Sequence, residues 1–138
     1  MIAAGLETFI TALPLASELA RYDFGTGTAP AVFSILPVPS DARQPNITIV
    51  EQGNSAWGCR DTIGAEVTAN VTLWGDRERS DKSLRDMAWE LYANLHHANV
   101  TFTGWDNWGV YATPPESTKS DDGFPGYQIS VLCRVLQT

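Results

Sequence analysis

The segment from Val67 to Leu95 constrains the fold most, because its hydrophobic rhythm changes halfway along. Between residues 65 and 74, apolar and polar positions alternate. One set is apolar, and the other comprises Glu66, Thr68, Asn70, Thr72 and Trp74. A period of two predicts a β-strand with one buried face and one polar face. Gly75 and Asp76 then interrupt the pattern.

After this break the apolar residues recur every three to four positions, which predicts an amphipathic helix. Ser80 or Asp81 can cap its first turn. The apolar stripe comprises Leu84, Met87, Ala88, Leu91 and Leu95, with Tyr92 at its edge. At about 100° per residue, Trp89 lies about 140° from Leu84. It is therefore expected off the stripe, on the side that carries Lys82, Arg85 and Asp86.

The rest of the chain predicts an α+β fold. Apolar spacing indicates a helix over 2–13 that Pro14 ends, and a helical piece over 15–19, before a flexible joint at 25–28. Strands are expected at 31–36, 47–51, 57–59, 100–103, 108–112 and 127–136. Turns are expected at 53–55 and 104–107, and a polar loop at 113–126. We therefore predict a single domain over 1–138, an antiparallel β-sheet packed against two main helices on one face.

Composition narrows the class of protein. The 138-residue chain has a net charge of −7 and only nine Lys and Arg residues, which form no basic cluster. We therefore do not expect a surface that binds the phosphates of a nucleic acid. The start of the chain lacks positive charge and contains Glu7, so neither a signal peptide nor a membrane span is expected. Cys59 and Cys133 have no metal-ligand spacing and are predicted to be buried thiols in a reducing compartment.

The sequence contains no catalytic signature: GxSxG, P-loop and GxGxxG patterns are absent. Adjacent side chains point in different directions, so His96 and His97 are not expected to share a metal. Asp121-Asp122-Gly123 lacks the other ligands of a calcium loop. We predict that the protein is not an enzyme, with no catalytic, cofactor or metal residues. A small hydrolase with a dispersed site is the alternative.

Two of the five tryptophans raise a different hypothesis. Trp105 and Trp108 flank a polar turn, GWDNWG, and could stack a sugar ring as in a carbohydrate-binding module. The simpler interpretation is that one packs in the core and the other covers the turn.

Most of the chain resembles the tail-terminator or tail-completion (neck) proteins of long-tailed bacteriophages and phage-like gene transfer agents. The resemblance begins in MIAAGLETFITALPLASELA, is most telling where VTLWGDRERS runs into SLRDMAWELYANLH, and ends in YQISVLCRVLQT. It does not extend to the loop PVPSDARQPN or the turn GWDNWG.

The resemblance implies a tail-terminator-like subunit of a ring, usually a hexamer, at the head-proximal end of the tail tube. The ring would end tube polymerisation and join the tail to the head connector. Its partners would be the tail tube protein and the connector protein, while DNA passes through without specific binding. The protein would be made in the host bacterial cytoplasm and reside in the virion. Another head–tail connector or neck protein is the close alternative.

A ring needs heterologous interfaces, in which one surface of a subunit meets a different surface of the next. The predicted halves are the polar strand face and the helix flank: Thr68, Asn70, Thr72 and Trp74 on the strand, Arg85 and Trp89 on the helix. The 113–126 loop is predicted to face the lumen or the tube, where its carboxylates repel DNA, and to order only on assembly. Its charged residues are Glu116, Lys119, Asp121 and Asp122.

Overall fold

The computed structural model describes residues 2–34, 38–57, 63–76 and 81–137. These residues form an α+β fold in which two α-helices and a mainly antiparallel sheet surround one hydrophobic core, as predicted. The helices are α1 (Ala3–Thr11) and α2 (Asp81–Leu95), and a 3₁₀-helix η1 (Pro14–Glu18) follows α1. No helix within the described ranges is both long and apolar enough to cross a membrane.

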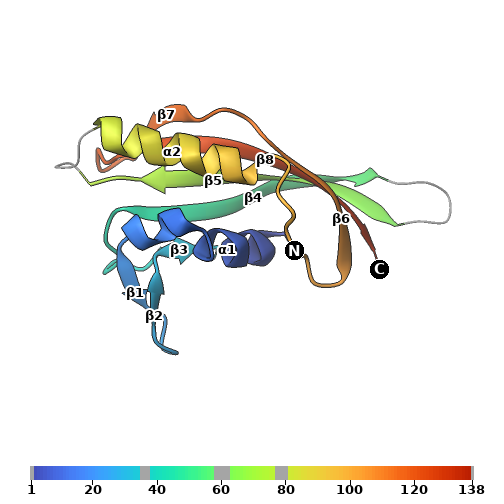
Figure 1. The fold of residues 1–138 in the computed structure, drawn as a ribbon, viewed down its shortest axis with the longest axis horizontal. Coiled ribbons are helices and arrows are strands. Elements are labelled where there is room, and N and C mark those ends of the chain that lie inside the picture. The colour runs from blue at the N-terminus through green and yellow to red at the C-terminus, as the bar shows by residue number, and fades with distance from the viewer. Residues whose placement is uncertain (1, 35–37, 58–62, 77–80, 138) are drawn as a thin grey trace.

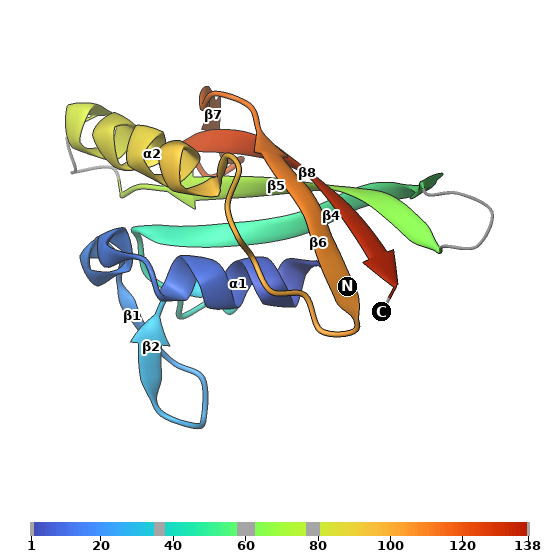
Figure 2. The same ribbon diagram turned by 45° about the vertical axis from the view of Figure 1, so that its right-hand side comes forward.

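The main sheet has the strand order β3-β4-β5-β8-β6, and β7 pairs with the first residues of β8 (Figure 1). All its pairings are antiparallel except that of β3 with β4. The strands are β3 (Val32–Phe33), β4 (Asn46–Trp57), β5 (Gly64–Trp74), β6 (Trp105–Ala112), β7 (Glu116–Lys119) and β8 (Pro125–Gln137). A separate hairpin, β1 (Arg21–Asp23) and β2 (Thr28–Pro30), projects from the body of the domain (Figure 2).

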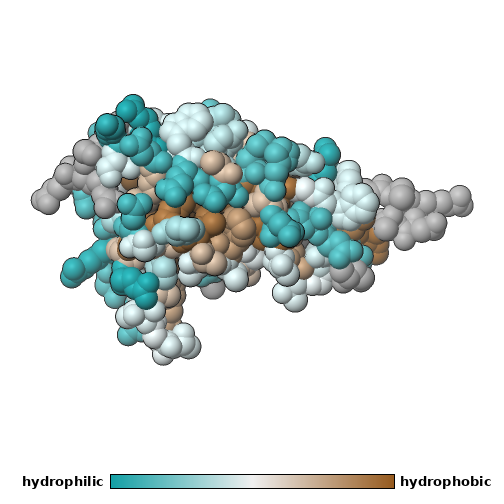
Figure 3. All heavy atoms as spheres, viewed as in Figure 1, coloured by the Kyte–Doolittle hydropathy of each residue, from teal (hydrophilic) through white to brown (hydrophobic). Residues whose placement is uncertain are grey.

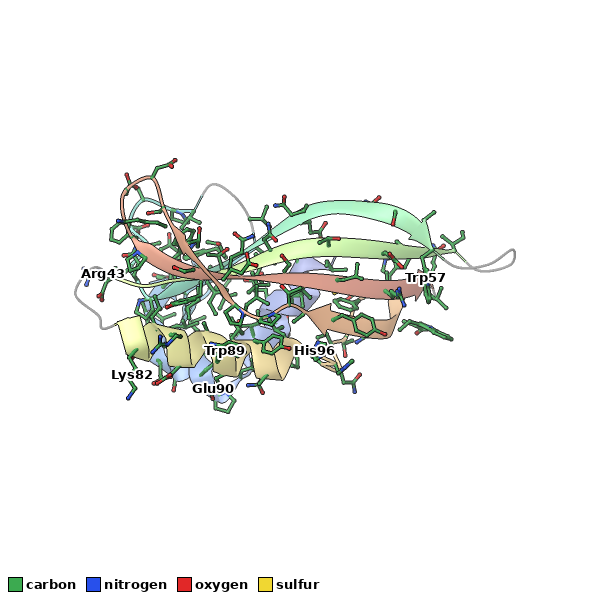
Figure 4. The ribbon with its side chains drawn as sticks, turned by 90° about the horizontal axis from the view of Figure 1, so that it is seen from above. Arg43, Trp57, Lys82, Trp89, Glu90 and His96 are labelled. Atoms are coloured by element: carbon green, nitrogen blue, oxygen red, sulfur yellow. The ribbon has the colours of Figure 1, made fainter. Side chains whose placement is uncertain are left out.

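Both helices lie on the same side of the sheet (Figure 4), with α1 against β3 and β4 and α2 against β8 and β6. The alternation in β5 explains this arrangement, because Val67, Val71 and Leu73 are fully or almost fully buried beneath the helices. On the helix-bearing side, Figure 3 shows apolar residues gathered between α1 and α2, with polar residues around them. The predicted strand followed by an amphipathic helix is confirmed as β5 followed by α2.

The start of α1 is held by a residue distant in sequence. No side chain at the N-cap position donates or accepts a capping bond, but Glu51 Oε1 on β4 accepts the N–H groups of Ile2 at 2.7 Å and Ala3 at 3.0 Å. Burial alone would raise the pKa of Glu51, but the hydrogen bonds from Ala3 and Ile2 favour the ionised form, and the pKa is lowered overall. The carboxylate also suits the positive end of the helix dipole.

Three predicted elements of the first half of the chain need correction. Residues 53–55 form no turn, because β4 runs on to Trp57 through an irregularity between Glu51 and Gly53. Pairing with the first half of β5 keeps this segment extended despite its turn-forming residues. The expected flexible joint at 25–28 is instead the tip of the β1–β2 hairpin, where Gly25 and Gly27 adopt positive φ. The predicted 31–36 strand is reduced to β3, and its residues 35 and 36 lie outside the described residues.

Three further corrections concern the second half. Residues 100–103 form no strand, only an isolated bridge from Phe102 to Trp105. The turn predicted at 104–107 is shorter, because β6 begins at Trp105 directly after Gly104, which has φ +82°. The 113–126 segment is not a continuous irregular loop, since β7 pairs with the start of β8.

The buried thiol prediction holds for one of the two cysteines. Cys133 is fully buried on the helix-facing side of β8, and burial raises its pKa to about 12. Cys59 lies outside the described residues.

Candidate interaction surfaces

The face of the sheet opposite the helices, called here the open face, carries the polar residues predicted for β5. Register places Thr68, Asn70, Thr72 and Trp74 on this face. Thr68 and Asn70 are half-buried, and Ser130 Oγ on β8 donates to Asn70 Oδ1 at 3.3 Å. In the described part of the chain neither helix lies over this face (Figure 4).

Thr72 and Trp74 differ from the prediction. Thr72 is buried, with only 6% of its surface exposed, because it sits between Thr48 and Gln128 on the central strand. The Trp74 indole N–H donates to Thr48 Oγ1 at 3.1 Å. The Trp74 ring also lies so close to Gly126 that a Cβ there would sit 2.7 Å from it. A monomer therefore accounts for Trp74 well, contrary to expectation; a neighbour-subunit contact there stays a prediction.

At the far end of the open face, four strands bring aromatic and charged side chains together. Arg134 Nε donates to Glu66 Oε1 at 2.9 Å. The guanidinium carbon of Arg134 lies 5.8 Å from the Trp57 ring centroid and 5.6 Å from that of Tyr111. The Trp57 and Trp108 ring centroids are 6.0 Å apart. We call these five residues the aromatic–arginine cluster.

The cluster was only partly visible in the sequence. Alternation along the last strand puts Arg134 on the face opposite Cys133, but it does not reveal which strands flank it. Trp57 was assigned to a separate strand, so its contact with Trp108 could not be foreseen.

The structure separates the two tryptophans of the sugar-binding hypothesis. Trp105 packs against the hydrophobic core, whereas Trp108 is 58% exposed and meets Trp57. Trp108 therefore pairs with Trp57 and Trp105 with the core, and sugar binding by Trp105 and Trp108 stays a prediction. The simpler interpretation, with one tryptophan in the core, describes Trp105 correctly.

The second predicted half, called here the α2 flank, consists of Arg85 and Trp89, both of which are exposed. Trp89 is 48% exposed, as the helical angle predicted, and Figure 4 shows it on α2. Its ring contacts Tyr92 edge-on at 5.6 Å. A large exposed aromatic beside an arginine is typical of the energetic centre of a protein interface.

His96 and His97 do not diverge as expected: their ring centroids lie 4.0 Å apart. The reason is that His97, in the turn that follows the end of α2 at Leu95, adopts the left-handed conformation, with φ +61°. His96 Nδ1 is already occupied, because it accepts the Ala112 N–H at 3.1 Å. Within the described ranges no three His, Cys, Asp or Glu residues form a group that could hold a metal.

The acidic segment after β6 lies at the opposite end of the sheet from the aromatic–arginine cluster. Glu116 and Lys119 are on β7, and Asp121 and Asp122 are in the turn that follows; all four are exposed. Ser120 closes this turn, since its hydroxyl and backbone N–H both bond to the backbone of Phe124. Ordering of the segment on assembly stays a prediction.

No protein-family model and no curated protein matches the sequence.

Proposed function

We propose that this chain is the subunit of a homo-oligomeric ring, expected to be a hexamer, at the head-proximal end of a bacteriophage or gene-transfer-agent tail tube. The ring ends tube polymerisation and joins the tail to the head connector. One observation carries the proposal: two exposed and chemically different surfaces, the open face and the α2 flank, lie on opposite sides of the sheet.

This arrangement matches what a ring requires. A heterologous contact joins unlike surfaces of successive subunits, and it gives a ring when the rotation from one subunit to the next closes. An antiparallel sheet can leave one face in water, so an uncovered face alone is weak support. The exposed aromatic residues Trp89 and Trp108, one on each surface, add weight because such residues are enriched at interfaces.

The charge of the chain supports a lumen through which DNA passes unbound. Sixteen acidic residues oppose nine basic ones. Lys and Arg along a channel would hold phosphate groups, whereas carboxylates repel them. The exposed Glu116, Asp121 and Asp122 at the β7–β8 end are the residues we assign to the lumen or the tube. Virion residence, after synthesis in the host cytoplasm, belongs to the same proposal.

Co-assembly with the tail tube protein tests the proposal. Sedimentation velocity and negative-stain microscopy of the chain, alone and with polymerising tube protein, are expected to show rings and tubes closed at one end. A species that stays monomeric at all concentrations, and leaves tube growth unchanged, would refute it. Binding to the connector protein without binding to the tube would favour the other neck-protein role.

A further inference from the structure

A pocket of about 180 Å³ opens at the end of the open face nearest β3 and β7. Val38, Trp74 and Phe124 give it apolar walls, and Asn46, Thr48 and Asp122 supply polar atoms. The volume suits a single side chain, since pockets for drug-sized ligands begin at about 300 Å³.

Asn46 is the unusual member of this lining. Only 3% of its surface is exposed. Its Nδ2 donates to the Arg43 carbonyl at 3.1 Å, and this bond fixes the orientation of the amide. Its Oδ1 is buried and receives no hydrogen bond from any residue that the structure describes. Most buried polar atoms have a partner, because an unpaired one loses its hydration without compensation. The oxygen therefore indicates a donor supplied from outside the subunit.

The surroundings specify the chemistry of that donor. Asn46 Oδ1 can only accept, and Thr48 Oγ1, which accepts the Trp74 N–H, has further lone-pair capacity. Asp122, an exposed residue of the lining, adds negative charge. One carboxylate is a poor ligand set for a divalent cation. A guanidinium suits the site better, because it presents five donors to several acceptors while its methylene stem lies along apolar walls.

Resting on the proposed ring, we infer that this pocket binds an arginine side chain of the neighbouring copy, and that Arg85 supplies it. Arg85 is exposed and has no ion pair with any described residue. It lies one helical turn from Trp89, on the same flank. The flank and the pocket are on opposite sides of the sheet, so the contact is head-to-tail and cannot form within one chain.

Three other described basic residues, Arg43, Lys82 and Lys119, are poorer candidates. Lys82 lines a surface hollow together with Glu18, Asp86 and Glu90 of its own subunit, so its immediate surroundings are already acidic. Arg43 and Lys119 belong to the end of the domain that carries the pocket, so neither can reach it from the opposite side of a neighbour.

Charge exchange tests the contact in the assembling protein. Arg85→Glu and Asp122→Arg should each weaken assembly about tenfold or more, and the double variant should recover it. Lys82→Glu, on the same helix, is the matched control and should change assembly little. An equal loss with Lys82→Glu, or no recovery in the double variant, would overturn the pairing.

Asn46→Leu separates a docking role from a structural one. Asn46→Leu removes the unpaired oxygen together with the Nδ2 bond to the Arg43 carbonyl, so the melting temperature of the monomer should fall by only a few degrees, while assembly weakens about tenfold or more. A variant that melts earlier but assembles normally would show that Asn46 serves the subunit alone, with water as its only further partner. Rings that persist in every variant would overturn this inference and leave the ring itself standing.

A third measurement works without assembly. N-acetyl-arginine amide at roughly 10 mM should shift the Asn46 side-chain amide resonances of the full chain, whereas N-acetyl-norleucine amide should not. Equal shifts with the two probes, or no shift with either, would overturn the pocket assignment. This outcome does not depend on whether the ring proposal is correct.

Discussion

The indole N–H of Trp74 on β5 donates to Oγ1 of Thr48 on β4, across the open face, at 3.1 Å. This bond ties the last residues of the strand that feeds α2 to the first residues of its neighbour. The sequence suggested that Trp74 contacts a neighbouring subunit, but this bond shows that Trp74 also contributes to the structure of its own subunit.

We expect Trp74→Phe and Thr48→Val each to destabilise the subunit by about 1 kcal/mol or more, because each removes one hydrogen-bond partner. The double variant should lose less than the sum, with a coupling of about 0.5–1.5 kcal/mol. Urea unfolding of the four proteins measures this coupling. Strict additivity would show that the two groups do not interact in solution.

The strand–helix unit was predictable because its signals are local. Periods of two and of 3.6 reveal which side of β5 and α2 is buried, whatever the strand order. The contact partners of Trp74, Arg134 and Trp57 could not be predicted in this way, because they depend on which strands become neighbours in the sheet. The burial of Asn46 could not be predicted from any local sequence pattern, because it results from the segments that fold over the end of the sheet.

The length of β4 shows how long-range pairing overrides local preference. Gly53, Asn54 and Ser55 are turn formers, yet each faces a residue of β5 in register. The His96–His97 contact is the converse case, in which a single left-handed residue at a helix end redirects a side chain. Neither conformation follows from composition or periodicity.

Trp89→Ala should leave the fold intact and weaken ring assembly. Trp89 is 48% exposed, so its truncation removes little buried surface from the subunit, and we expect a stability loss below about 1 kcal/mol. At an interface the same truncation commonly costs about 2 kcal/mol or more. Circular dichroism melts and sedimentation velocity separate the two effects, with Lys82→Ala as the control on the same helix. Loss of cooperative melting would place Trp89 in the core instead.

The Glu51 carboxylate should make stability depend on pH on the acid side. Its folded pKa lies below the unfolded value, so its contribution is present above that unfolded value, about 4.3, and is lost as the pH falls through the folded pKa. Because Glu51 is exposed, screening limits the contribution, and we expect about 0.5 kcal/mol at neutral pH. Glu51→Gln should therefore be less stable than the wild type at pH 7 and equal to it near pH 2. A constant difference between the two proteins across this range, in urea unfolding, would contradict the assignment.

Gly5→Ala should destabilise the protein, against the usual effect of such a change in a helix. Propensity alone favours alanine inside α1 by about 1 kcal/mol. A Cβ at position 5, however, would lie 2.6 Å from Cδ1 of Phe102 and 2.8 Å from the Thr101 carbonyl oxygen. Phe102 is buried and the carbonyl belongs to the backbone, so neither yields easily, and overpacking of this kind costs about 1–3 kcal/mol. Ala4→Gly, at the adjacent exposed position, is the control and should lose only the propensity term of about 0.5–1 kcal/mol. A melting temperature above that of the wild type for Gly5→Ala would mean that α1 does not approach the 101–102 segment this closely.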